Sequence, residues 1–278
     1  MTASLKSIEP YLQRLGYERA PPPTLDTLRA LQLRHTTAFP FETLAMLLRE
    51  PVRLDLPSLE RKLLHESRGG YCYELNLLFL ALLRRLGFDA RGVTGRVVMG
   101  GPVDAQTART HLAILITLDD VRWLVDVGFG GMVPTAPLRL EAGVEQSTPH
   151  EPYRLDRRGE GWVLLARVAD EWRAMYVFDL QRQSPIDYEV GNWYVSTHPD
   201  SPFRDQLIAA RTGPGLRLTL NNERFTEHRI GQPSRRHMLE SVEAVVGVLE
   251  RQFGIRVPAH PQLHAAIARQ IGREPAAA

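Results

Sequence analysis

The single cysteine of the chain, Cys72, lies in the stretch with the most obvious chemical potential, residues 68–76. Two glycines stand shortly before the cysteine, and a long apolar run follows it. This pattern predicts a tight turn with the cysteine in the first turn of a buried helix. The unpaired N–H groups of a helix start favour negative charge, so a thiol there ionises more readily to the nucleophilic thiolate. From composition alone, Cys72 is more often expected to be a small buried apolar residue than a nucleophile.

One β-hairpin could supply a base and an acid to this thiol. His111 opens one β-prone run, Asp126 lies near the end of the next, and Asp119-Asp120 forms a turn pair between them. A hairpin that turns at this pair places Asp126 opposite the neighbourhood of Ala113, two residues from His111. Diagonal cross-strand neighbours lie within side-chain reach. The spacing therefore predicts a nucleophile, a base and an orienting acid.

Each residue also has an ordinary structural interpretation. His111 alone suits a strand-edge histidine, and Asp126 alone suits a cap for the glycine turn that follows it. However, Asp126 interrupts an apolar run, where a carboxylate is costly unless a partner satisfies it. For Glu74 and Asn76, close to the cysteine, a structural role is the preferred interpretation.

Composition limits the classes of function. The 278 residues are 44% hydrophobic and 24% charged, with a formal net charge of +2. This small net charge does not indicate a nucleic-acid-binding protein. One cysteine excludes an internal disulfide and a multi-thiolate metal centre, and no cluster has metal-ligand spacing, so no metal site is expected. No apolar run approaches the roughly 20 residues that span a bilayer. We expect a soluble, cytoplasmic protein without a membrane partner.

The elements that must position these residues change in type along the chain. Helical spacing predominates up to residue 87, and the expected helices cover residues 5–15, a segment capped by Thr24, 58–66 and 72–87. Closely spaced β-prone runs between residues 91 and 178 predict a small antiparallel barrel or curled sheet. The last part combines a hairpin with two helices, at residues 216–230, 238–253 and 263–271. Without a long linker, the three regions should pack as one body.

The motif Arg-Gly-Gly-Tyr-Cys-Tyr-Glu-Leu-Asn at 68–76, with His111 at a strand start and Asp-Val-Gly-Phe-Gly at 126–130, closely resembles the arylamine N-acetyltransferase family in its bacterial form. Supporting similarity lies at residues 35–44, 134–138 and 192–199. The resemblance covers the chain from about residue 30 to 205.

This resemblance implies an α+β fold with a cysteine-protease-like (transglutaminase-like) core. It implies three regions: a helical bundle at residues 1–87 that carries the nucleophile, an antiparallel β-barrel at 88–198 that carries the histidine and aspartate, and an α/β lid at 199–278. The implied triad is Cys72, His111 and Asp126. The implied reaction is ping-pong transfer of acetyl from acetyl-CoA to arylamines, arylhydrazines or arylhydroxylamines, with no permanently bound cofactor.

Further contacts are predicted for both substrates. The aromatic residues expected to face the arylamine are Phe41, Tyr71 and Phe129, and the residues expected to contact CoA are Thr107 and Gly130. Thr43 and Leu75 depart from the family's usual residues and leave the substrate range open. The expected oligomeric state is a monomer or a homodimer.

Alternatives come from two classes. One is another cysteine enzyme on the same machinery, such as a peptidase, a transglutaminase-like enzyme or an amide synthase. The other is a non-catalytic binding protein that kept the pocket.

Overall fold

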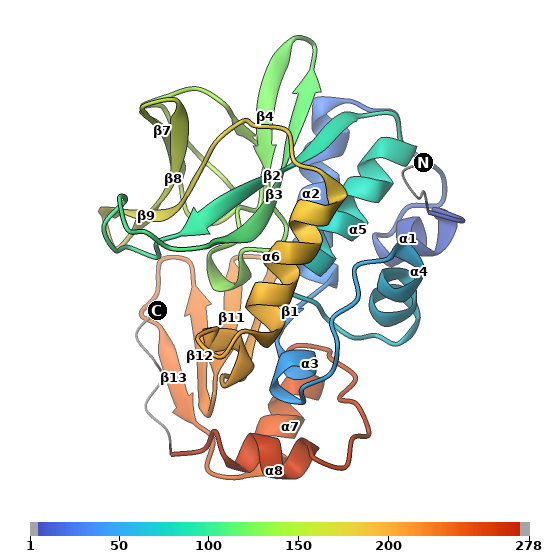
Figure 1. Ribbon diagram of the computed structural model, residues 1–278, viewed down its shortest axis with the longest axis vertical. Coiled ribbons are helices and arrows are strands. Elements are labelled where there is room, and N and C mark those ends of the chain that lie inside the picture. Colours follow the sequence, from blue (N-terminus) through green and yellow to red (C-terminus); the bar gives the residue numbers. More distant parts are fainter. Residues whose placement is uncertain (1–4, 273–278) are drawn as a thin grey trace.

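The computed structural model describes residues 5–272, so the outermost parts of the predicted first and last regions, 1–4 and 273–278, lie outside the described residues. Most of the N-terminal helices lie beside a curled antiparallel sheet, and a second sheet with its own helices lies at the other end of the molecule (Figure 1). Both sheets are antiparallel throughout their main ladders, which confirms the α+β class.

The N-terminal helices follow the predicted order. They are α1 (Glu9–Arg14), α2 (Leu25–Ala38), α3 (Leu44–Leu47), α4 (Leu56–Leu59), the π-helical turn η1 (Glu60–His65) and α5 (Cys72–Arg85). Thr24 caps α2 as predicted, because its hydroxyl accepts from Thr27 N at 3.2 Å. The first helix begins at Glu9, later than predicted, and the predicted helix 58–66 starts earlier and is largely π-helical.

The larger sheet has eight strands in the order β5-β4-β3-β2-β9-β8-β7-β6. Their bounds are Asp89–Val97 (β2), Arg109–Leu118 (β3), Val121–Val125 (β4), Leu138–Arg139 (β5), Glu145–Gln146 (β6), Tyr153–Arg158 (β7), Gly161–Val168 (β8) and Glu171–Phe178 (β9). The edge strands meet through Gln146, whose side-chain amide bonds both the N–H and the C=O of Arg139, at 2.7 and 2.9 Å. The predicted barrel is therefore confirmed.

The predicted hairpin is also confirmed in its register. Ile114 pairs with Val125, and the turn residues Asp119 and Asp120 both adopt positive φ, 50° and 60°. Two consecutive left-handed residues make the tight turn that matches the twist of the strands. Asp126 follows immediately after β4.

The second sheet has the order β1-β10-β11-β12-β13. Its strands are β1 (Phe41–Glu42), β10 (Ile208–Gly213), β11 (Leu216–Asn221), β12 (Arg224–Arg229) and β13 (Arg235–Met238). The helices α7 (Val242–Arg251) and α8 (Leu263–Ala268) share a core with this sheet. The chain between β9 and β10 forms α6 (Pro185–Thr197) and the 3₁₀ turn η3 (Pro202–Arg204).

Two local predictions are corrected, and one helix was not predicted. Phe41–Glu42 is an edge strand and not a turn, because it pairs with Ala209 and Ala210. The helix expected from Met238 starts only at Val242, because residues 235–238 pair with β12. The helix α6 is not among the predicted elements; it packs against β3.

The helix α5 is the centre of the largest core. Its residues Leu78, Phe79, Leu82 and Leu83 are completely buried, and the same cluster includes side chains of α2 and β3. An apolar helix buried on most sides is held rigidly by packing. Its first residue is Cys72, so the core fixes the place of the thiol.

Candidate active site

The loop before α5 is braced by two ion pairs. Glu74 accepts from Tyr71 N at 3.1 Å, which caps the helix start, and its other oxygen binds Lys62 Nζ at 2.7 Å. Arg68 donates from Nε and Nη2 to Glu42 Oε1, at 3.0 and 2.7 Å, and both of these side chains are buried. Glu74 therefore has a structural role, as expected from the sequence: it caps the helix start and pairs with Lys62.

A β-bulge lies directly before the histidine. Gly95 of β2 pairs with His111, while the next residue of β2 pairs with Arg109, so Thr110 is the extra residue. Bulges re-aim the neighbouring side chains and release a backbone group from the ladder. The Thr110 carbonyl accepts from the Cys72 thiol, with Sγ 3.5 Å away. The bulge thus brings β3 to the start of α5.

The histidine and the acid form a buried pair. His111 Nε2 lies 2.6 Å from Asp126 Oδ2, and the two residues are 2% and 0% exposed. Burial lowers the pKa of His111, but the charge of Asp126, its hydrogen bond and the Cys72 side chain outweigh burial and raise that pKa to about 10. Because Asp126 occupies Nε2, Nδ1 is the ring nitrogen left to act on the thiol.

The carboxylate of Asp126 is held by three further donors. Oδ1 accepts from Asn76 Nδ2 at 3.0 Å and from Gly128 N at 2.9 Å, and Oδ2 accepts from the Tyr176 hydroxyl at 3.1 Å. Asn76 lies one turn after Cys72 on α5, a spacing that places both on one face and could have indicated its role. Nothing in the sequence pointed to Tyr176, which reaches Asp126 from β9.

Gly128 lets the loop lie directly on the helix that carries the thiol. A Cβ at this position would come 2.7 Å from Cys72 Cα and 2.7 Å from Asn76 Nδ2. Only glycine permits so close an approach. Gly128 therefore serves a close approach between two parts of the site, the loop after β4 and the start of α5.

Of the aromatic residues predicted for the arylamine, Phe129 lies beside His111. Its ring meets His111 edge-on, with centroids 4.9 Å apart and an interplanar angle of 81°, and it is half-buried. Phe41 lies against Gly130, since a Cβ at Gly130 would be 3.8 Å from the Phe41 ring. Gly130 adopts a positive φ of 59°. These three residues therefore surround one turn next to the histidine.

Two predicted residues lie in other surroundings. Tyr71 is completely buried and donates its hydroxyl to Asn192 of α6, so its polar group is already satisfied within the protein. Thr107 lies in the loop before β3, where its hydroxyl donates to Val97 O at 3.1 Å and its carbonyl accepts from Arg96.

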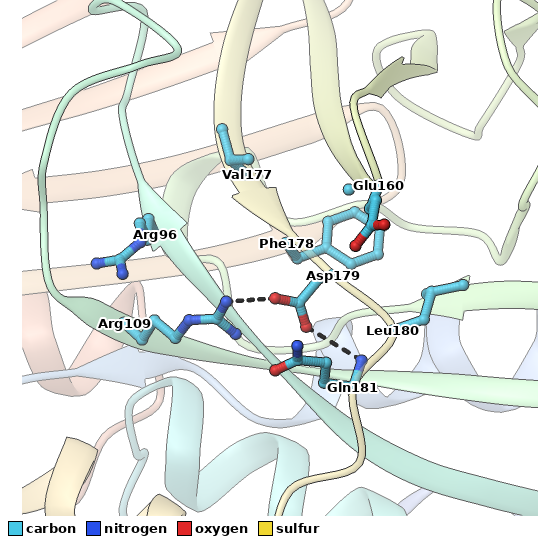
Figure 2. A pocket seen from close by; sticks show the side chains of 9 residues that line it. Arg96, Arg109, Glu160, Val177, Phe178, Asp179, Leu180 and Gln181 are labelled. Carbon is cyan, nitrogen blue, oxygen red and sulfur yellow. Dashed lines mark hydrogen bonds and ion pairs between the residues drawn. The ribbon is translucent and has the colours of Figure 1, made fainter.

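A cavity of about 440 Å³ lies beside that loop, and Cys72, His111 and Asp126 do not line it. Figure 2 shows its polar side, where the Asp179 carboxylate accepts from Arg109 and from Gln181 N, the latter at 3.1 Å. Its charged groups include Arg96 and Glu160, so acids and bases balance.

Within residues 5–272, no group of three or more histidine, cysteine, aspartate or glutamate side chains is placed to hold a metal ion. No helix in the same part of the chain is long and apolar enough to cross a membrane.

Comparison with known proteins gives consistent matches. A profile described as N-acetyltransferase matches residues 24–262. The arylamine N-acetyltransferase / N-hydroxyarylamine O-acetyltransferase of Salmonella typhimurium is 42% identical over 248 residues, 89% of this chain and 88% of that protein. The arylamine N-acetyltransferase of Mycolicibacterium smegmatis is 43% identical over 250 residues, 88% and 90% of the two chains. The Mycobacterium marinum arylamine N-acetyltransferase in complex with CoA superposes with a TM-score of 0.89 at 44% identity, over 94% of this chain and 98% of that one.

Proposed function

We propose that this chain, which belongs to the arylamine N-acetyltransferase family, carries an acetyl group on Cys72 during transfer from acetyl-CoA to an arylamine. The chain is an acyltransferase with acetyl-CoA as its co-substrate and no permanently bound cofactor. Arylhydrazines and arylhydroxylamines belong to the same proposed acceptor class. The observation that carries the proposed mechanism is the buried 2.6 Å pair of His111 and Asp126 beside the start of the helix that begins at Cys72.

In the first half-reaction His111 Nδ1 takes the thiol proton, and Asp126 stabilises the imidazolium through Nε2. The Cys72 thiolate attacks the acetyl carbonyl, a bond forms between Sγ and the carbonyl carbon, and the bond to the CoA sulfur breaks. The imidazolium returns its proton to the CoA thiolate, which leaves as free CoA. A cysteine suits this step because one thioester replaces another of nearly equal energy.

The oxyanion of each tetrahedral intermediate needs hydrogen-bond donors. The N–H groups in the first turn of α5 have no partner within the helix, and Cys72 occupies the first position of that turn. The Cys72 N–H, together with that of Tyr73 or of the turn at Gly130, is our proposed donor pair.

In the second half-reaction the amine nitrogen attacks the acetyl carbon of acetyl-Cys72. His111 removes the amine proton, the carbon–sulfur bond breaks and the thiolate is restored. The reaction is downhill because an amide is more stable than a thioester. Phe129, Phe41 and Tyr71 are our choices for contacts to the aromatic ring, and Thr107 and Gly130 are our choices for contacts to CoA.

We also propose a cytoplasmic location and a monomer or homodimer. A reducing compartment keeps a lone nucleophilic thiol free, and the same compartment holds acetyl-CoA.

Mass spectrometry of the intact protein tests this mechanism. After mixing with acetyl-CoA and no amine, the wild type should gain the mass of one acetyl group, and an arylamine should remove it with release of the acetylated amine. Cys72→Ser should gain no acetyl group under the same conditions. An acetylated amine produced at the wild-type rate by Cys72→Ala, or an adduct mapped to another residue, would refute the proposed mechanism.

A further inference from the structure

We propose that Gln32 and Arg217 are positioning residues that clamp the segment Asp126–Ala136 from two sides, and thereby set the triad acid and Phe129. The inference rests on the proposed roles of Cys72, His111 and Asp126. Neither residue touches the triad side chains. They act on the backbone of the segment, which begins with the acid and passes through the turn beside the base.

The first half of the clamp is Gln32, a completely buried residue of α2. Its Nε2 lies within hydrogen-bond distance of three carbonyl oxygens, those of Asp126 (3.1 Å), Pro134 (2.8 Å) and Ala136 (3.2 Å). One amide group therefore ties the two ends of the segment together. It holds the backbone of the same residue whose carboxylate binds His111.

The orientation of this amide is fixed by its surroundings. Reversing it would aim Oε1 at three carbonyl oxygens, which are all acceptors. In the observed orientation Oε1 is buried and has no hydrogen-bond partner among the described residues. One buried acceptor therefore stays unpaired while Nε2 lies within hydrogen-bond distance of three carbonyls. An apolar residue of similar size would fill the same space without this unpaired acceptor, so we infer that the contacts to the carbonyls are the role of Gln32.

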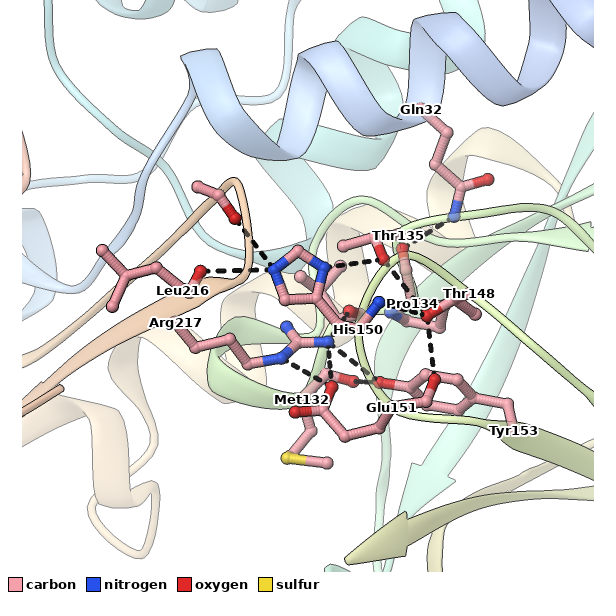
Figure 3. Close-up of polar contacts among 12 residues, drawn as sticks. Gln32, Met132, Pro134, Thr135, Thr148, His150, Glu151, Tyr153, Leu216 and Arg217 are labelled. Carbon is pink, nitrogen blue, oxygen red and sulfur yellow. Dashed lines mark hydrogen bonds and ion pairs between the residues drawn. The ribbon is translucent and has the colours of Figure 1, made fainter. Parts of the chain in front are cut away.

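The second half of the clamp is Arg217 of β11, which is 3% exposed. Its Nη2 donates to Val133 O at 2.9 Å, and its Nε donates to Glu151 Oε2 at 2.7 Å. Tyr153, which also lies 3.5 Å from Nη2, donates its hydroxyl to Met132 O at 2.8 Å. Figure 3 shows Gln32 and Arg217 reaching the segment from different elements.

A third contact continues the same pattern. The Thr135 hydroxyl lies 3.1 Å from His150 Nδ1, and His150 Nε2 donates to the carbonyls of Gly213 and Leu216, at 3.0 and 3.2 Å. Each residue from Met132 to Thr135 is therefore held by a side chain from elsewhere in the fold. The second sheet contributes to these contacts through Arg217 and the β10–β11 turn, so it helps to build the site.

The test compares Gln32→Met, Arg217→Met and Arg217→Lys with the wild type. Three quantities are measured: the single-turnover rate of acetylation by acetyl-CoA, the pH midpoint of Cys72 alkylation by iodoacetamide, and the melting temperature. Both Met variants should lose about tenfold or more in the acetylation rate, and their alkylation midpoint should rise, because a displaced Asp126 stabilises the imidazolium less. Arg217→Lys should fall between Arg217→Met and the wild type, and it carries the test for Arg217 if the Met variant does not fold.

The matched control is Arg229→Met, an exposed arginine on the neighbouring strand β12, which should keep wild-type values. Variants that melt at lower temperature yet keep the wild-type acetylation rate and alkylation midpoint would overturn the proposal, because Gln32 and Arg217 would then only stabilise the fold. Alkylation needs no acetyl-CoA. The alkylation midpoint therefore tests the clamp even if the wild type forms no acetyl adduct. The absence of that adduct would refute the proposed function and not the clamp.

Discussion

The side chain of Asn76 connects the helix that carries Cys72 to Asp126, the proposed acid of the triad. Its Nδ2 donates to Asp126 Oδ1 at 3.0 Å, and its Oδ1 accepts from Val127 N, also at 3.0 Å. Asn76 is completely buried and follows Cys72 by one helical turn. The same helix therefore places the thiol and orients the carboxylate.

Replacing this amide should impair both activity and stability. In Asn76→Ala, Asp126 loses one of its donors and the Val127 N–H is left unpaired in the core. We expect a decrease of about 1.5–3 kcal/mol in the free energy of unfolding, and a fall in kcat/KM that exceeds the effect of any unfolded fraction. Chemical denaturation and steady-state kinetics measure the two quantities. Arg85→Ala, at the exposed end of α5, is the control, and an Asn76→Ala enzyme with wild-type kcat/KM would contradict the orienting role.

The raised pKa of His111 makes part of the stability depend on pH. Its folded-state pKa of about 10 exceeds the ordinary value of 6.5, so the pair with Asp126 contributes stability that is fully present below pH 6.5 and disappears as the pH rises through 10. The free energy of unfolding of the wild type, minus that of Asp126→Asn, should therefore shrink across this range. A difference that stays constant from pH 6 to pH 10 would show that the pair is not charged.

The opposite dependence is expected at His35. Burial lowers the pKa of His35 to about 3, and neither ring nitrogen has a hydrogen-bond partner among the described residues. Below about pH 6.5 the unfolded chain binds a proton at this histidine and the folded chain does not. The free energy of unfolding therefore decreases as the pH is lowered, by up to about 1.4 kcal/mol per pH unit. His35→Phe should remove this part of the slope between pH 6.5 and pH 4.

The matched control is His65→Gln, at an exposed position, which should leave the slope unchanged. Denaturant unfolding at several pH values measures the slope directly. If His35→Phe has the wild-type slope, protonation of His35 is not part of acid destabilisation.

The close approach at Gly128 predicts a steric effect. The added Cβ of Gly128→Ala would lie 2.7 Å from both Cys72 Cα and Asn76 Nδ2, so the loop must move away from the helix. We expect a loss of about 1–3 kcal/mol of stability together with a slower acetylation of the thiol. Gly213→Ala should be well tolerated, because Leu216 Cβ, the nearest atom beyond the two chain neighbours, would be 3.9 Å from the new Cβ. Equal behaviour of the two variants would rule out a steric requirement at Gly128.

The parts of the site that could be predicted are those with a local sequence signal. The turn at Asp119 and Asp120 sets the register of the hairpin, and this register brings His111 near Asp126. The glycines before Cys72 and the apolar run after it similarly set the helix start. Short-range rules of turn and helix formation are sufficient in both cases.

The residues that could not be predicted act across long separations in the sequence. The segment after β4 is contacted from three different elements, by Tyr176, Gln32 and Arg217. No sequence motif around these three residues indicates such a role. The bulge at Thr110 depends on pairing with another strand. Arg68 and Glu74 proved to be bound to Glu42 and Lys62, partners that spacing did not identify.

The short strand β1 has a consequence for the order of events when the protein is made. Phe41 pairs with Ala210 in the second sheet and forms a parallel bridge with Gly70, just before the cysteine. The loop that presents the thiol is therefore completed only by a strand from the last third of the chain, and contacts of such long range form late. We expect a nascent chain that has not yet released β10 from the ribosome to hold its thiol in an unfinished loop, so that reactivity appears only after synthesis is nearly complete.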